Sequence, residues 1–431
     1  LVMFFISISA QAQFSGKPFI TKWKTDNSGV SNSDQVIINI NTNYTYNYDI
    51  DWGDGSTETG LTTAPSHTYS SPGTYEIKIY GDFPALFNSN TGTDSPKLVE
   101  VSQWGDIEWE SMYYMFSDCI NMEYTATDVP DMDLVTDMTR MFWYAEKFNA
   151  DLTGWDVSNV TTMKQIFGQT VIFNGDISTW DVSSVTNMHW AFIYSEAFNQ
   201  DISGWDVSSV NTMQSMFTGT TAFDQDLGDW DVSSATNLLY MFNGASLSQA
   251  NYDSILIGWS QNPNLQSGVN FGVNNLTYCE GTEARQKIID DFGWTFSGDD
   301  PSCPFVTTWK TDNSGVSSSN QITLPLKFSS SFTCTIDWGD GTVEEFTEIS
   351  SKTHTYSSPG TYVVSIWGDF PGINFSISST DDKLKLVEFN QWGSTQWDDL
   401  SYTFAGCSNL EYLADDAPDL SNVTDMSWMF T

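Results

Sequence analysis

The sequence has 431 residues with 55 acidic and 15 basic side chains, which gives a formal net charge of −40. This charge argues against binding to nucleic acid, whose phosphates must be neutralised by Lys and Arg, and against docking on anionic membranes. Hydrophobic residues make up 40% and aromatic residues 15%, which is enough for packed cores, and the length indicates more than one domain.

Residues 1–13, LVMFFISISAQAQ, open the chain with a short apolar run that ends in the small-x-small pattern Ala10-Gln11-Ala12. This pattern predicts the remnant of a secretory signal peptide whose basic segment would lie upstream, with a buried strand as the alternative. No other stretch approaches the roughly 20 apolar residues of a membrane span. We therefore expect an exported protein.

Residues 17–96 alternate apolar and polar side chains in runs such as 35–40 and 75–80, a pattern that favours strands. Gly53-Asp54-Gly55 and Ser71-Pro72-Gly73 provide turns. We predict a small β-sandwich. The Asp residues around Asp54 are also spaced somewhat like a metal loop, but they lack the full calcium-loop spacing and the closing Glu, so we interpret them as a turn.

The Trp-Gly-Asp-Gly turn at 52–55, followed by HTY at 67–69 and PGTY at 72–75, resembles the polycystic-kidney-disease (PKD) type of Ig-like domain. In that family, the turn is structural and the modules act as spacers or binding domains. The segment WKTDNSGVS at 23–31 departs from the family pattern.

Residues 97–250 repeat with a period of about 25 residues. A fixed period of this length predicts a solenoid in which each repeat buries its apolar face on its neighbours. The consensus FNxDLxxWDVSxVTNMxxMFxxA resembles the BspA-type leucine-rich-repeat surface proteins of bacteria, in the WDVSNVTNMxxMF variant. That resemblance implies a cell-surface protein for adhesion or recognition.

Each repeat contains a Trp-Asp-Val motif, whose Trp and Asp are the two residues of interest. If the motif is extended, Trp faces the core with Val, which is the interpretation we favour over an exposed strip for stacking on sugars. We expect a short helical turn over 212–217. The tryptophans are Trp155, Trp180, Trp205 and Trp230.

The Asp of the same motif points outward and forms a column of like charges, which needs compensation. Each Asp can accept hydrogen bonds from backbone N–H groups of its own turn, or the column can hold Ca²⁺. We favour turn capping, and predict no firm metal site and no other cofactor. The ligand-facing column is Asp156, Asp181, Asp206 and Asp231; a second acidic column is Asp151, Asp176, Asp201 and Asp226, which follows Asn149, Asn174, Asn199 and Asp224.

Residues 251–303 resemble the C-terminal cap of such an array, with an amphipathic helix from Glu283 to Phe292 that ends at Gly293. Cys279 and Cys303 flank a compact segment and are the best candidate disulfide, which would tie the cap together. Cys119, Cys334 and Cys407 are expected to pack as buried thiols.

The chain is a duplication, because WKTDNSGVS, the Trp-Gly-Asp-Gly turn and the HTY motif all recur. Residues 304–382 are predicted to be a second PKD-like β-sandwich, and 383–431 the truncated start of a second solenoid. The predicted fold is thus mixed but mainly β, with PKD-like β-sandwich modules alternating with a leucine-rich-repeat-like α/β solenoid.

Catalytic motifs such as HExxH, GxSxG, a P-loop or CxxC do not occur, and no catalytic residue is predicted. Acidic residues recur in every repeat, whereas an active site needs one unique constellation. We expect a secreted or cell-surface bacterial protein, not an enzyme, that binds a glycan or protein ligand multivalently. The alternatives are accessory modules of an exported carbohydrate-active or degradative enzyme, and a purely structural stalk. The sequence gives no indication of oligomeric state.

Overall fold

The computed structural model describes residues 14–88, 92–327, 332–347, 351–375 and 381–431, and it is mainly β with few helices, as expected. The expected signal-peptide remnant at 1–13 lies outside the described residues. The chain forms two compact units. One unit runs to Leu276 and includes Glu283–Asp299, and the other contains Thr277–Thr282 and Asp300–Thr431.

The first unit begins with a sheet whose strand order is β4-β3-β6-β1-β7-β8. Burial alternates along β1, where Phe19 and Trp23 face the core. The alternation of apolar and polar side chains expected for strands of this module is therefore confirmed in β1. A separate two-stranded sheet pairs β2 with β5. The strands are β1 Phe19–Lys24, β2 Gln35–Ile37, β3 Asn47–Asp51, β4 Thr57–Leu61, β5 Ser66–Thr68, β6 Thr74–Asp82, β7 Leu98–Gln103 and β8 Glu123–Tyr124, with a 3-10 helix at Ser95–Lys97.

The first sheet continues into the repeats without a break. β1 pairs antiparallel with β7, beyond the predicted boundary at 96/97, and β7 pairs parallel with β8. Trp104, at the end of β7, is fully buried and lies 5.6 Å from the Phe19 ring and 5.3 Å from the Trp155 ring. One core therefore spans the sheet and the first repeats, although the sequence divides them into two modules.

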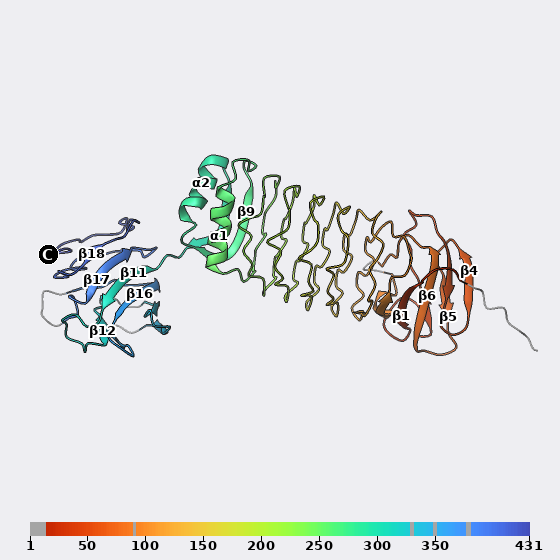
Figure 1. Ribbon diagram of the computed structural model, residues 1–431, viewed down its shortest axis with the longest axis horizontal. Coiled ribbons are helices and arrows are strands. Elements are labelled where there is room, and N and C mark those ends of the chain that lie inside the picture. The colour runs from red at the N-terminus through yellow and green to blue at the C-terminus, as the bar shows by residue number, and fades with distance from the viewer. Residues whose placement is uncertain (1–13, 89–91, 328–331, 348–350, 376–380) are drawn as a thin grey trace, which may run out of the picture. The chain divides into compact units, whose positions relative to one another are not determined.

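The repeats stack side by side between β6 and α1 (Figure 1), and one residue of each repeat forms a parallel bridge to the next. The bridges link Asp137, Thr162, Asn187, Thr212 and Asn237 in turn. Phenylalanine rings stack along the interior, with Phe142 and Phe167 5.5 Å apart and nearly parallel. The same spacing recurs from Phe167 to Phe192, so each repeat buries its apolar side chains on the next, as the period predicted.

The helical turn expected over 212–217 is wrong. Ser215 has φ of +52°, in the left-handed region, and the segment forms consecutive turns. The backbone N–H groups of Met213, Ser215 and Phe217 donate to the following repeat, to Asn237, Leu239 and Met241. A helix needs those donors for itself, so the stacking of repeats replaces it with turns.

The last repeat is followed by helix α1 (Gln249–Ser260), strand β9 (Asn270–Tyr278), helix α2 (Thr282–Phe292) and strand β10 (Thr295–Pro301). Phe271 of β9 forms a parallel bridge with Leu238 of the last repeat. Helix α2 covers the predicted range and stops at Gly293, whose φ is +68°. Helix α1 was not expected from the sequence.

The second unit repeats the first sheet, in the order β14-β13-β16-β11-β17-β18, and again has a separate pair, β12 with β15. Trp309 lies opposite Tyr362 as Trp23 lies opposite Tyr75. Its strands are β11 Phe305–Lys310, β12 Gln321–Leu324, β13 Cys334–Asp337, β14 Val343–Phe346, β15 Lys352–Thr355, β16 Thr361–Gly368, β17 Leu386–Gln391 and β18 Glu411–Tyr412. Within the described part of the chain, no helix is long and apolar enough to span a bilayer.

Candidate functional site

The tryptophan column lies in the core of the repeats. Its four members are between 3% and 5% exposed, and the rings of Trp180 and Trp205 stack 6.5 Å apart. The Trp205 Nε1 donates to the carbonyl oxygen of Ile177 at 3.2 Å, and Trp259 in α1 continues this pattern by donating to Leu227 at 3.0 Å. Trp155, Trp180, Trp205 and Trp230 are thus buried with the core side chains, the location expected from the sequence, although their segments are not regular strands.

The first aspartate column is exposed, and each carboxylate is bonded within its own turn. Asp181 Oδ1 accepts from the backbone N of Ser183 at 3.1 Å and from its hydroxyl at 2.6 Å. These hydrogen bonds lower the pKa of Asp181, while the neighbouring Asp156 charge opposes the shift. The corresponding backbone bonds at Asp156, Asp206 and Asp231 are 3.1, 3.0 and 2.9 Å long. The geometry is that of turn capping.

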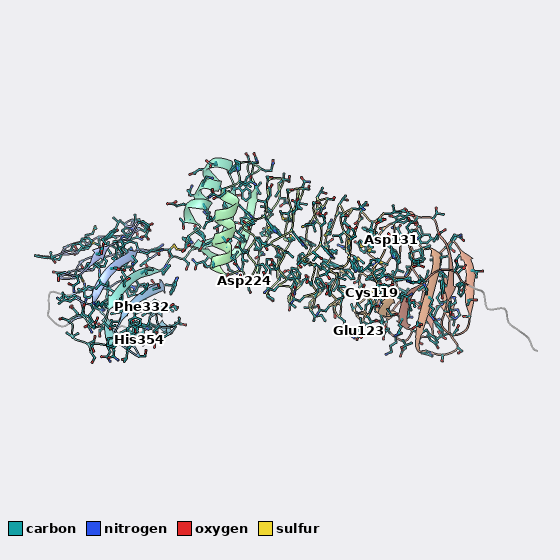
Figure 2. The ribbon with its side chains drawn as sticks, in the orientation of Figure 1. Cys119, Glu123, Asp131, Asp224, Phe332 and His354 are labelled. Carbon is teal, nitrogen blue, oxygen red and sulfur yellow. A yellow bond between two sulfur atoms is a disulfide. The ribbon has the colours of Figure 1, made fainter. Side chains whose placement is uncertain are left out.

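The second acidic column behaves in the same way, since Asp201 accepts from the backbone N of Ser203 at 3.0 Å. The asparagines two residues earlier have a different role. Asn174 Oδ1 accepts from the backbone N of Asn199, and Asn199 Oδ1 accepts from that of Asp224, both at 2.9 Å. Asp224 (Figure 2) ends this ladder by accepting from Ser248 at 2.7 Å. The ladder ties each repeat to the next.

The calcium alternative receives no support from this geometry. Among the residues that the structure describes, no three His, Cys, Asp or Glu side chains form a group that could hold a metal ion. One oxygen of each column carboxylate already accepts from its own turn. Ca²⁺ prefers 6 to 8 oxygen ligands, which columns that each contribute one carboxylate per repeat do not supply.

A histidine packs against the Trp-Gly-Asp-Gly turn in each sheet module. His67 stacks on Trp52 with ring centres 4.8 Å apart, and its Nε2 lies 2.9 Å from Asp54 Oδ2. Burial raises the pKa of Asp54, but hydrogen bonds from Ser56 and His67 outweigh it and bring the pKa to about 2. His354 (Figure 2) and Asp340 repeat the 2.9 Å contact. Both histidines therefore pack on a tryptophan and contact the turn aspartate.

A buried ion pair lies under the WKTDNSGVS segment, and the sequence interpretation missed it. Asp94 and Lys97 are fully buried. Asp94 accepts from the backbone N of Val30 at 2.9 Å, and Lys97 Nζ donates to the Asn32 carbonyl at 2.8 Å. A Cβ on Gly29 would lie 2.4 Å from Asp94 Oδ1, which explains the glycine. The recurrence of Asp and Lys at this spacing, as Asp382 and Lys385, was the available signal.

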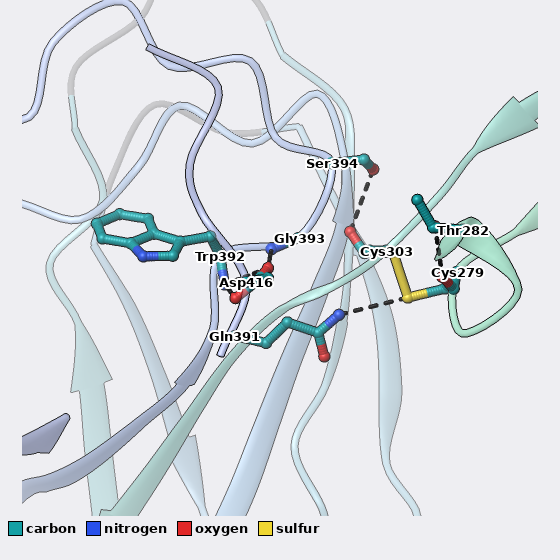
Figure 3. The surroundings of a disulfide bond; sticks show 8 residues. All are labelled: Cys279, Thr282, Cys303, Gln391, Trp392, Gly393, Ser394 and Asp416. Atoms are coloured by element: carbon teal, nitrogen blue, oxygen red, sulfur yellow. Dashed lines mark hydrogen bonds between the residues drawn. A yellow bond between two sulfur atoms is a disulfide. The ribbon is translucent and has the colours of Figure 1, made fainter. Parts of the chain in front are cut away.

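The predicted disulfide between Cys279 and Cys303 is present, with a Cα–Cα distance of 4.7 Å (Figure 3). Both cysteines belong to the second unit. Gln391 Nε2 donates to Cys279 Sγ at 3.3 Å, and Ser394 N donates to the Cys303 carbonyl at 2.9 Å. Cys119 and Cys334 are buried thiols and Cys407 is half-buried, close to the prediction.

A further face of the repeats is formed by the turns around each Met-Phe pair, which we call the turn face. Residues flanking these pairs differ from repeat to repeat, and aligning the repeats would have revealed this from the sequence. The turns stack in register, since Arg140 N donates to the Lys164 carbonyl at 2.9 Å. The turn face consists of residues 113–118, 139–144, 164–169, 189–194, 214–219 and 239–244.

Aromatic and basic side chains pack against one another on the turn face. The Arg140 guanidinium lies 5.1 Å from the ring centres of both Tyr114 and Trp143, and its Nε donates to Gln165 Oε1 at 2.8 Å. Tyr194 is 48% exposed. Burial lowers the pKa of His189 on this face, and the nearby Lys164 charge lowers it further.

Residues 110–192 and 150–255 each match a protein family described as Mycoplasma protein of unknown function, DUF285. Both matches fall on the repeats and support, at a coarse level, the expected BspA-like repeat protein. No match was found among curated proteins or solved structures. The PKD-like assignment of the sheet modules stays a prediction.

Proposed function

We propose that this chain is a secreted or cell-surface bacterial protein that adheres to or recognises another surface through the sides of its repeats. The single observation that carries the proposal is the unbroken stacking of repeats in one register, which presents equivalent positions every 25 residues. An extended surface of this kind suits many parallel contacts with a glycan or a protein. In this proposal the repeats form a leucine-rich-repeat-like solenoid and the PKD-like sheet modules are spacers.

Three further observations support an extracellular binding role. The Cys279–Cys303 disulfide suits an oxidising compartment. The net charge of −40 favours solubility. The column carboxylates of the repeats are equivalent to one another and accept hydrogen bonds from their own turns, so they serve the fold and not a unique reaction. These observations support binding over catalysis.

The test is attachment of beads that carry the whole chain. Beads with a range of chain densities are placed on surfaces coated with mucin, collagen, fibronectin or albumin, and their retention under flow is counted. We expect retention on a glycan or protein coat to rise more steeply than the chain density, because multivalent binding multiplies weak contacts. Retention on every coat no greater than on albumin would overturn the proposal.

A further inference from the structure

We propose that the turn face between Arg140 and Tyr194 binds a short oligosaccharide that carries an acidic group. The inference rests on the proposed function, names the ligand class and the face of the repeats, and places this ligand at one patch and not at equivalent positions of every repeat. The binding patch consists of Arg140, Trp143, Lys164, His189, Trp190 and Tyr194, which come from three successive repeats.

The aromatic residues of the patch are not required by the stacking of repeats. Trp190 holds the place of Gln165 in the preceding repeat and of Ser215 in the following one. Tyr194 similarly holds the place of Gly219. The backbone bonds between turns are the same in each case, since Gln165 N, Trp190 N and Ser215 N all donate to the following repeat at 2.9 to 3.0 Å. The fold thus accepts a polar or small residue at both positions.

The ring of Tyr194 is held in place and still accessible. A Cβ on Gly219 would lie 2.3 Å from Tyr194 Cδ1, so the ring packs directly against that glycine. Because the residue is nevertheless 48% exposed, part of the ring remains open to solvent. Trp143 is also held by a glycine, since a Cβ on Gly168 would lie 2.4 Å from Trp143 Cζ3, but this ring is buried and leaves Tyr194 as the exposed ring. Rings that are fixed before binding lose little conformational entropy when a sugar ring packs on them.

The patch is basic within an acidic protein. Arg140, Lys147 and Lys164 are the only Lys or Arg residues between positions 98 and 250, and two of them lie in the patch next to His189. Arg140 is bonded to Gln165 and lies between two aromatic rings. Among the described residues, no carboxylate pairs with Lys164. An ammonium group without a carboxylate partner, on the same face of the repeats as the exposed Tyr194 ring, fits an anionic group on a sugar.

The size of the patch favours a small ligand over a protein. A standard protein interface buries roughly 800 Å² and 20 to 30 residues on each side, whereas the patch has six side chains, and Trp143 is only 8% exposed. The changes from repeat to repeat also argue against a regular polymer lying along the stack, which would meet the same side chain at each step. A short, non-periodic oligosaccharide agrees with both observations.

Binding to the whole chain is measured by calorimetry. The acidic probes are sialyllactose and trigalacturonate, which carry carboxylates, and a chondroitin sulfate tetrasaccharide, which also carries sulfate. Lactose and cellotriose are the neutral probes. We expect at least one acidic probe to bind and the neutral probes to bind at least tenfold more weakly. Comparison of the acidic probes identifies the anionic group.

The variants Tyr194→Ala and Lys164→Gln test the patch. Each is expected to weaken binding of the acidic probe by about tenfold, the effect of losing one stacking or charge contact. Lys164→Gln is also expected to reduce the preference for acidic over neutral probes. The matched controls are Tyr240→Ala, an exposed tyrosine of the turn face outside the patch, and Lys147→Gln, an exposed lysine outside the turn face. Both controls should change affinity less than twofold, and all variants should melt like the parent chain.

The inference is overturned if no acidic probe binds, if neutral probes bind equally well, or if the controls weaken binding as much as the patch variants. It is also overturned if the patch variants reduce bead retention on a protein coat while no acidic sugar binds, because the ligand is then a protein. The proposed function fails separately, by the absence of bead retention. If beads that carry the patch variants are retained as well as beads that carry the parent chain, the inference is wrong and the proposed function still holds.

Discussion

Asp94 and Lys97 lie together with both side chains fully buried, and Lys97 Nζ is 3.8 Å from Asp94 Oδ1. The Ser31 hydroxyl is placed between them, since it donates to Asp94 and lies 2.7 Å from Lys97 Nζ. Asp382 and Lys385 repeat the arrangement at 3.9 Å. The recurring loop of each sheet module therefore folds around a buried ion pair.

Removal of one partner of this pair is expected to destabilise the first unit. Lys97→Met leaves the Asp94 charge buried without its cation and removes the hydrogen bonds that Lys97 Nζ donates to the carbonyls of Asn32 and Gln35. We expect a loss of about 3–5 kcal/mol in the free energy of unfolding, measured by urea titration. The exposed Lys147→Met is the control and should change stability by about 0.5 kcal/mol or less. A loss no greater than in the control would contradict this account.

The aspartate columns are expected to act as turn caps and not as cation sites. Asp181→Asn keeps an acceptor for Ser183 and should leave the melting temperature nearly unchanged, whereas Asp181→Ala should cost about 1 kcal/mol. The parent chain should melt at the same temperature in the presence of calcium as in the presence of a chelator. A rise with calcium that Asp181→Asn abolishes would instead establish a cation site on the column.

Acid is expected to weaken the turn around Asp54. Because its folded pKa of about 2 lies below the ordinary value of 3.8, its contribution to stability is complete above about pH 4 and is lost as the pH falls toward 2. Urea midpoints measured from pH 5 to pH 2 should therefore fall less steeply for Asp54→Asn than for the parent chain. Other carboxylates titrate in both proteins, so both urea midpoints will fall with pH. If the midpoint falls equally steeply in Asp54→Asn and in the parent chain, Asp54 does not have this role.

Loss of the disulfide is expected to destabilise the segment that it encloses. Cys279 and Cys303 are separated by 24 residues, and closing a loop of this length contributes about 3 kcal/mol in the chain-entropy description. The double variant Cys279→Ser and Cys303→Ser should therefore melt at a lower temperature. A reductant should lower the melting temperature of the parent chain to that of the variant and leave the variant unchanged. If the reductant lowers the melting temperature of the parent chain and of the double variant equally, the loss of stability does not come from the disulfide.

Local patterns were enough to predict several features. The alternation in Trp180-Asp181-Val182 identified which side chain is buried, because neighbouring side chains of an extended segment point to opposite faces. Gly293 marked the end of α2, since its positive φ suits a helix terminus. The 25-residue period likewise predicted the phenylalanine stack, because equivalent residues of stacked repeats must meet.

The sequence by itself determined which apolar side chains of the repeats are buried and which of them stack on one another, since these follow from periodicity along the chain. Only the tertiary structure decided the turns at Ser215, because their backbone donors are shared with the following repeat. It also decided the pairing of β1 with β7 and the burial of Asp94 with Lys97 beside a loop more than 60 residues away. The partners in these interactions are distant in the chain, and a local pattern carries no record of which distant groups will meet.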